Sequence, residues 1–133
     1  MGGIYFMTSI GLNEHHIRMF PSSVILAKID PSEACSPKEK QLVLEYKCLI
    51  KTLEENREKG LRLQHSKGIF ARLQIYQNNK KNKSIQKRMK QIEESKTLSS
   101  LLFRKRYALV MQQHEIERQR MREWNEIYFN KKG

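Results

Sequence analysis

The sequence predicts an all-α protein of two to four helices, elongated or folded as a helical hairpin or coiled coil, with an extended N-terminal arm. Two observations predict this class. Residues 69–132 contain neither glycine nor proline and are rich in Gln, Lys, Arg, Glu, Met and Leu, which favour helices over strands. All three prolines lie within the first 37 of the 133 residues, so only this part of the chain resists long helices.

The predicted arm, residues 1–36, is largely irregular because prolines and glycines interrupt it. We expect it to become ordered on a partner, and a disordered terminus is the alternative. A short helix over 12–20 is a further option, since Asn13 is a good N-cap residue. The candidate partner anchors in the arm are three apolar residues near its start: Ile4, Tyr5 and Phe6.

The helical region, residues 37–133, begins with a strong start signal. Ser36 and Glu39 have the spacing of a capping box, and a proline stands at the first helical position. Gly60 stands where a C-cap glycine would, so the first helix is predicted over 37–59. Its apolar residues step by four, three and four, which predicts a stripe that pairs with another helix. The helix-pairing residues are Leu42, Tyr46, Leu49 and Leu53.

Two further helices are predicted, over 69–79 and over 84–130. Glycines at both ends of residues 61–68 predict a break between helices there. A continuous helix is the alternative, because one glycine costs a helix only about 1 kcal/mol. The run QNNKKNKS would end the second helix, and Ser84 would cap the third. An apolar stripe opens with Ile69, Leu73 and Tyr76 and restarts with Ile85, Met89 and Ile92. A register shift of the stripe is expected near 95–99.

The net charge of +12 is concentrated in one part of the chain. Residues 61–110 carry 13 Lys and Arg against two acidic residues, whereas residues 1–60 are neutral overall. Such a field attracts polyanions: nucleic acid, acidic protein surfaces or anionic lipid. A solvated helix face is the alternative. The candidate polyanion-binding residues are Lys80, Lys81, Lys83, Lys87, Arg88, Lys90, Arg104, Lys105 and Arg106.

The C-terminal end of the chain carries aromatic side chains behind a row of arginines. Trp, Tyr and Arg are favoured anchors at protein interfaces, and aromatic residues beside basic ones also suit the stacking of nucleic-acid bases. The alternative is that Trp124 and Ile127 close the core of a helix pair. The candidate partner anchors in this part are Trp124, Tyr128 and Phe129.

The sequence contains no recognisable catalytic motif. Its four histidines and two cysteines lack the spacing of a metal or nucleophile site, and no glycine-rich loop could cradle a phosphate. We therefore expect no enzyme, no catalytic residue, no metal site and no cofactor. There is no run of 18 apolar residues and no secretion signal, so we expect no membrane span and a cytoplasmic location.

The proline-containing arm followed by helices with the segment FRKRYALVMQQHEIERQRMREWNEIYF resembles the small basic helical proteins of ciliary and flagellar microtubules, the inner-lumen proteins especially. The resemblance implies a cytoskeletal, structural protein of the cilium or flagellum that binds tubulin or neighbouring axonemal filaments without catalysis. Tubulin is acidic, which suits the net charge. Two alternatives stay open: an RNA-binding or ribosome-associated helical protein, and a coiled-coil adaptor that dimerises through residues 37–60 and 98–127.

Overall fold

The computed structural model describes residues 12–132, and this range is helical without a strand. The all-α prediction is confirmed, but residues 12–132 form five α-helices where two to four were expected. The elements are α2 (Glu14–Met19), α3 (Ser22–Lys28), the 3-10 helix η1 (Pro31–Glu33), α4 (Pro37–Gln64), α5 (Ile69–Glu93), the 3-10 helix η2 (Lys96–Leu98) and α6 (Ser99–Lys132). They form two compact units: one comprises residues 22–102, and the other combines α2 with α6 from residue 103 onward.

The described part of the arm differs from the irregular segment that the sequence predicts. Residues 12–36 contain α2, α3 and η1, because the prolines there lie at helix boundaries instead of inside helices. The optional helix capped by Asn13 is confirmed: Asn13 Oδ1 accepts from the His16 backbone N–H at 3.1 Å. The anchors proposed at Ile4, Tyr5 and Phe6 lie outside the described residues.

In the larger unit, α3 packs against α4 and α5. Its side chains Ile25 and Leu26, with the following Ile29, are fully buried. Lys47 of α4 donates from Nζ to the carbonyl oxygen of Ala27 at 3.0 Å, near the end of α3 where unpaired carbonyls favour a cation. This part of the arm is therefore built into the core of the chain.

Helix α4 starts as predicted and ends later than predicted. Ser36 Oγ accepts from the Glu39 N–H at 3.2 Å, and Glu39 Oε2 accepts from the Cys35 N–H at 2.7 Å, one residue before the position of a standard capping box. The predicted end at residue 59 is wrong, since the helix runs through Gly60 to Gln64. Gly68, with a φ of 139° that suits only glycine, makes the turn into α5 instead.

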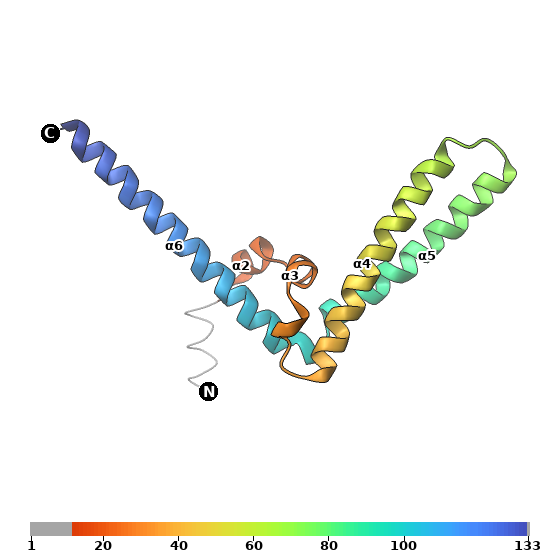
Figure 1. Cartoon of the computed structure of the whole chain (residues 1–133), viewed down its shortest axis with the longest axis horizontal. Helices are drawn as coiled ribbons and strands as arrows, with labels where there is room; N and C mark the ends of the chain where they lie inside the picture. Colours follow the sequence, from red (N-terminus) through yellow and green to blue (C-terminus); the bar gives the residue numbers. More distant parts are fainter. Residues whose placement is uncertain (1–11, 133) are drawn as a thin grey trace. The chain divides into compact units, whose positions relative to one another are not determined.

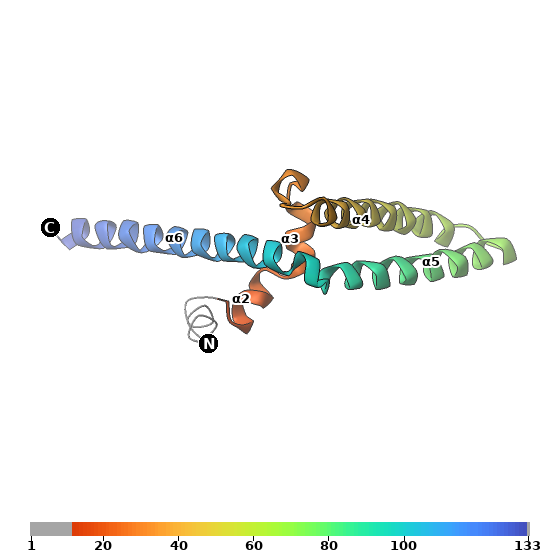
Figure 2. The ribbon, with the colours of Figure 1, turned by 90° about the horizontal axis from the view of Figure 1, so that it is seen from below.

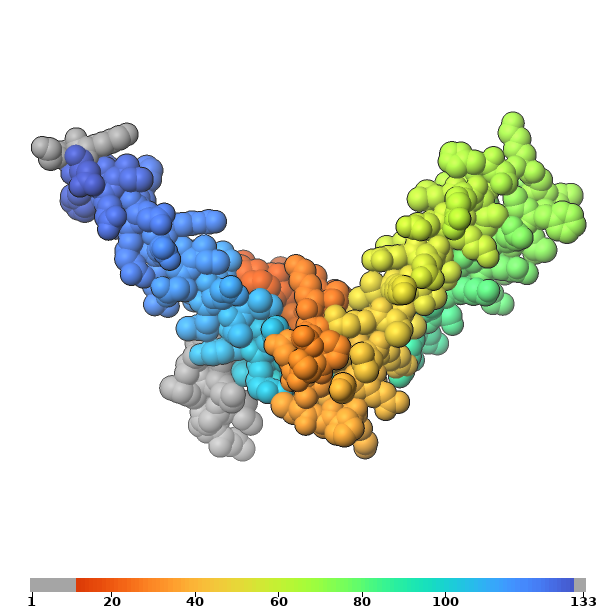
Figure 3. Space-filling view, viewed as in Figure 1, coloured from red at the N-terminus to blue at the C-terminus, as the bar shows by residue number. Residues whose placement is uncertain are grey.

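Helices α4 and α5 form an antiparallel hairpin (Figures 1 and 2). In the space-filling view, the atoms of α4 and α5 lie in contact along the hairpin (Figure 3). Of the predicted pairing residues, Tyr46 and Leu53 are buried and Leu42 and Leu49 are half-buried. The apolar stripe of α4 is thus partly covered within the same chain, because α4 packs against α5, α3 and η2.

The predicted break at 79–84 does not exist, because α5 is continuous from Ile69 to Glu93. Two of its three asparagines, Asn78 and Asn82, lie on the side that packs against α4, and the buried Asn78 donates from Nδ2 to the carbonyl oxygen of Asn56 at 2.7 Å. This contact with α4 outweighs the poor helix propensity of Asn. The expected helix over 84–130 is instead interrupted at residues 94–98, within the region where the register shift was predicted, and Ser95 caps η2 there.

Candidate docking face on helix α5

Helix α5 carries two opposite rows of side chains, each stepping by four and three residues. The inner row is buried or half-buried against α4: Ala71, Ile75, Asn78, Asn82, Ile85, Met89 and Ile92. The outer row is exposed at every position, and we call it the outer face: Ile69, Leu73, Tyr76, Lys80, Lys83, Lys87 and Lys90. Because side chains three and four residues apart are neighbours on a helix, the outer face is one continuous strip.

The half of the outer face nearest the hairpin turn is apolar. The exposed fractions are 85% for Ile69, 51% for Leu73 and 65% for Tyr76, and Phe70 beside them is 83% exposed. Single exposed apolar residues are ordinary on protein surfaces, whereas a contiguous apolar strip indicates an interaction site. This part of the site was missed as a site at the sequence level, although the spacing of Ile69, Leu73 and Tyr76 was visible there.

The other half of the outer face is basic. Four of the predicted polyanion-binding residues fall on it in a row: Lys80, Lys83, Lys87 and Lys90. Within the described residues, none of these lysines takes part in an ion pair. A surface hollow lined by Tyr76, Asn79, Lys80, Asn82, Lys83 and Gln86 lies where the apolar and basic halves meet. The charge of this half is available to an external anion.

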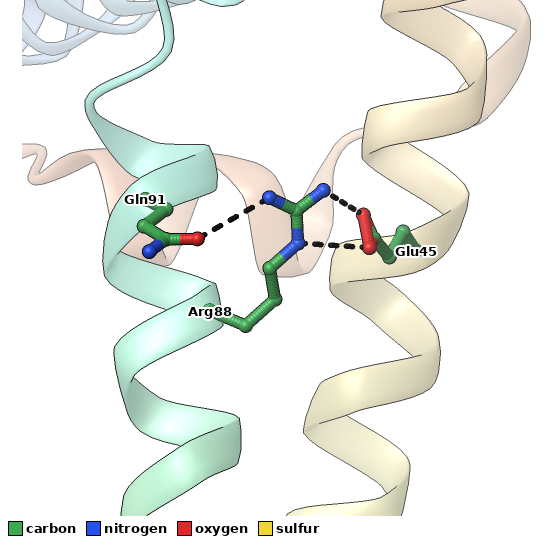
Figure 4. A network of polar contacts seen from close by, with 3 residues as sticks. All are labelled: Glu45, Arg88 and Gln91. Carbon is green, nitrogen blue, oxygen red and sulfur yellow. Dashed lines mark hydrogen bonds and ion pairs between the residues drawn. The ribbon is translucent and has the colours of Figure 1, made fainter.

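Arg88 has a different role from the lysines and does not belong to the outer face. Its Nε donates to Glu45 Oε1 at 2.9 Å and its Nη2 to Glu45 Oε2 at 2.8 Å, while Nη1 reaches Gln91 Oε1 at 3.4 Å (Figure 4). The hydrogen bonds from Arg88 hold the pKa of Glu45 below its ordinary value. Arg88 therefore joins α5 to α4 through an exposed ion pair, and its role as a polyanion contact stays a prediction. Lys81 is exposed beside the outer face.

The second predicted basic group lies on α6, in the smaller unit. Arg104 is exposed, Lys105 is half-buried and Arg106 is only 8% exposed. Arg106 donates from Nε to the carbonyl oxygen of Phe20 at 2.8 Å, at the end of α2, and burial lowers the pKa of its guanidinium. The prediction of Arg106 as a polyanion contact is corrected, because its side chain ties α2 to α6.

The predicted aromatic anchors at the end of α6 are exposed. The exposed fractions are 65% for Trp124, 47% for Tyr128 and 67% for Phe129. Trp124 and Tyr128 share a helix face with Ile127, while Phe129 stands beside Tyr128 with ring centroids 6.0 Å apart. In this structure Trp124 and Ile127 do not close a helix-pair core, since both are more than half exposed.

Residues 12–132 hold no cluster of three or more His, Cys, Asp or Glu side chains that could bind a metal ion. Among the described helices, none is long and apolar enough to cross a membrane. Comparison with protein-family models, with curated proteins and with solved structures finds no match to this chain.

Proposed function

We propose that this chain is a non-enzymatic interaction protein that docks through the outer face of α5 onto an acidic protein assembly, the microtubules of cilia and flagella. One observation carries the proposal: the four exposed lysines of the outer face follow one another with no acidic residue between them. A helix face that only needs to be solvated normally mixes both signs of charge, as the exposed part of α4 does.

The apolar half of the outer face favours a protein partner over RNA. A phosphate backbone offers counter-charges for Lys80 and Lys83 but no apolar surface for Ile69 and Leu73. A protein surface can present both, with acidic and apolar side chains side by side. The choice of microtubules among acidic assemblies rests on the resemblance of the whole chain to small basic ciliary proteins and on the acidity of tubulin.

The proposal is tested by co-sedimentation of the full chain with microtubules. We expect the chain to pellet at low salt and to be released as salt rises, because exposed charges are screened. The test variant replaces Lys80, Lys83, Lys87 and Lys90 with Glu. The matched control replaces four exposed lysines of α4 with Glu, which gives the same net charge: Lys38, Lys40, Lys51 and Lys59.

The expected result is loss of pelleting for the α5 variant and retention for the α4 control. Equal loss in both variants would show that net charge alone binds the chain. No pelleting of the unmodified chain at low salt would refute the proposal. Recovery of RNA cross-linked to the chain in cells, with the same dependence on the α5 lysines, would replace it with the RNA-binding alternative.

A further inference from the structure

The two ends of the outer face differ in chemistry, whereas a plain basic patch would be uniform along its length. Its apolar residues occupy the end near the hairpin turn, and its lysines occupy the rest. The strip from Ile69 to Lys87 covers 19 residues, and the 18 helical rises between its ends amount to about 27 Å at about 1.5 Å each. Its steps of four and three are those by which two helices pack along a shared seam.

We infer that the outer face of α5 binds a single acidic amphipathic helix of a partner protein, which lies along it as a third helix beside the α4–α5 hairpin. The partner helix places apolar residues against Ile69, Leu73 and Tyr76, and carboxylates against Lys80, Lys83 and Lys87. This inference rests on the proposed function in taking the outer face as the docking site, and it adds the shape and the chemistry of the occupant.

The structure supports a helix as the occupant because the inner row, which has the same spacing, already packs against a helix, α4. There, seven positions in steps of four and three pack against α4. The outer face repeats this spacing on the opposite side of the helix, with large apolar residues at its first three positions. Helical pairing on two faces of α5 accounts for apolar side chains that the hairpin leaves exposed.

The charge of the face selects the partner. A second copy of this chain would bring the lysines of one outer face against those of the other if the copies paired in parallel, or against its apolar half if antiparallel. Both arrangements leave lysines without a counter-charge, which is unfavourable at a helix seam. An acidic helix satisfies Lys80, Lys83 and Lys87 together, and its apolar half covers Leu73.

The test uses two labelled synthetic helical peptides of three heptads with identical composition. The block peptide has Leu at the seam positions of one half and Glu at those of the other. The interleaved peptide alternates the same Leu and Glu along the seam. Fluorescence anisotropy with the full chain is expected to show binding of the block peptide about tenfold tighter than that of the interleaved peptide, equivalent to about 1.4 kcal/mol.

Substitutions on the outer face then test each half separately. Leu73→Ser is expected to weaken block-peptide binding about tenfold, whereas the control Leu44→Ser, at an exposed apolar position on α4, leaves it unchanged. Lys83→Glu is expected to weaken binding, and a block peptide with Lys in place of Glu should recover affinity for a Lys80, Lys83 and Lys87→Glu variant. Circular dichroism verifies that each variant stays helical.

Equal binding of both peptides, or equal effects of Leu73→Ser and Leu44→Ser, would overturn the inference. A concentration-dependent dimer of the unmodified chain that Leu73→Ser dissolves would also overturn it, because a second copy would then be the occupant. Block-peptide binding without microtubule pelleting would leave the inference standing and refute the proposed microtubule function. Microtubule pelleting without block-peptide binding would refute the inference of a partner helix and leave the proposed microtubule function standing.

Discussion

The orientation of the outer face depends on a polar contact inside the hairpin, in which Asn78 of α5 bonds to the carbonyl oxygen of Asn56 on α4, close to Gly60. A Cβ atom added at Gly60 would lie 3.2 Å from Asn78 Nδ2, closer than ordinary van der Waals contact. The same nitrogen donates to the carbonyl oxygen of Asn56 at 2.7 Å, which holds it in place. Glycine therefore lets α5 approach α4 closely enough for Asn78 to bond to the α4 backbone.

This geometry predicts that the effect of Gly60→Ala depends on residue 78. Alanine inside a helix is favoured over glycine by about 1 kcal/mol. In the unmodified chain this gain is offset, because Asn78 must retreat and weaken a hydrogen bond worth about 1 kcal/mol. In an Asn78→Ala background the space is open, so Gly60→Ala should stabilise by the full amount of about 1 kcal/mol. The expected coupling between the two sites is thus about 1 kcal/mol.

Urea denaturation followed by far-ultraviolet circular dichroism measures this cycle, with amide exchange of α5 as a local check. At a slope of about 2 kcal/mol per molar urea, the predicted gain raises the midpoint by about 0.5 M in the Asn78→Ala background only. The matched control is Lys59→Ala at the exposed neighbouring position, which should act equally in both backgrounds. The same shift for Gly60→Ala with and without Asn78 would refute the reasoning.

Three further perturbations have defined outcomes. Burial, the nearby charge of Glu93 and a hydrogen bond to Glu93 raise the pKa of Tyr46 to about 12. The stability that comes from keeping the Tyr46 hydroxyl protonated should therefore be complete below pH 10 and lost as pH rises through 12. Urea denaturation at a series of pH values should show a smaller alkaline loss of stability in Tyr46→Phe. The hydrogen bond from Arg88 lowers the pKa of Glu45. The unmodified chain should therefore be slightly more stable than Glu45→Gln above about pH 4.5, and this difference should vanish as pH falls through the lowered pKa. A stability difference that persists in acid would contradict the pairing of Glu45 with Arg88. Gly68→Ala should lower the unfolding free energy by about 1–3 kcal/mol through its φ of 139° alone, since nothing lies within 4 Å of the added Cβ, and an unchanged melting temperature would contradict this.

The features that could be predicted from the sequence are those encoded by neighbouring residues. The caps at Asn13 and Ser36 are hydrogen bonds between groups three residues apart, and the break near 95–99 contains Ser95, which caps locally. The extension of α4 past Gly60 and the roles of Arg88 and Arg106 depend on partners far along the chain. Nothing in the local sequence distinguishes such an arginine from its exposed neighbours.

The missed continuity of α5 carries the most information about function. At the sequence level the apolar residues Ile69, Leu73 and Tyr76 and the later Ile85 and Met89 look like two helices, because the asparagine-rich run QNNKKNKS separates them. In the structure they lie on opposite sides of one helix: the later group faces α4 and the earlier group faces away from it. A helix that served only the hairpin would keep its large apolar residues on the inner row. Their placement outside, in line with the lysines and at the same spacing, is the feature that a partner helix would explain and that the hairpin alone does not.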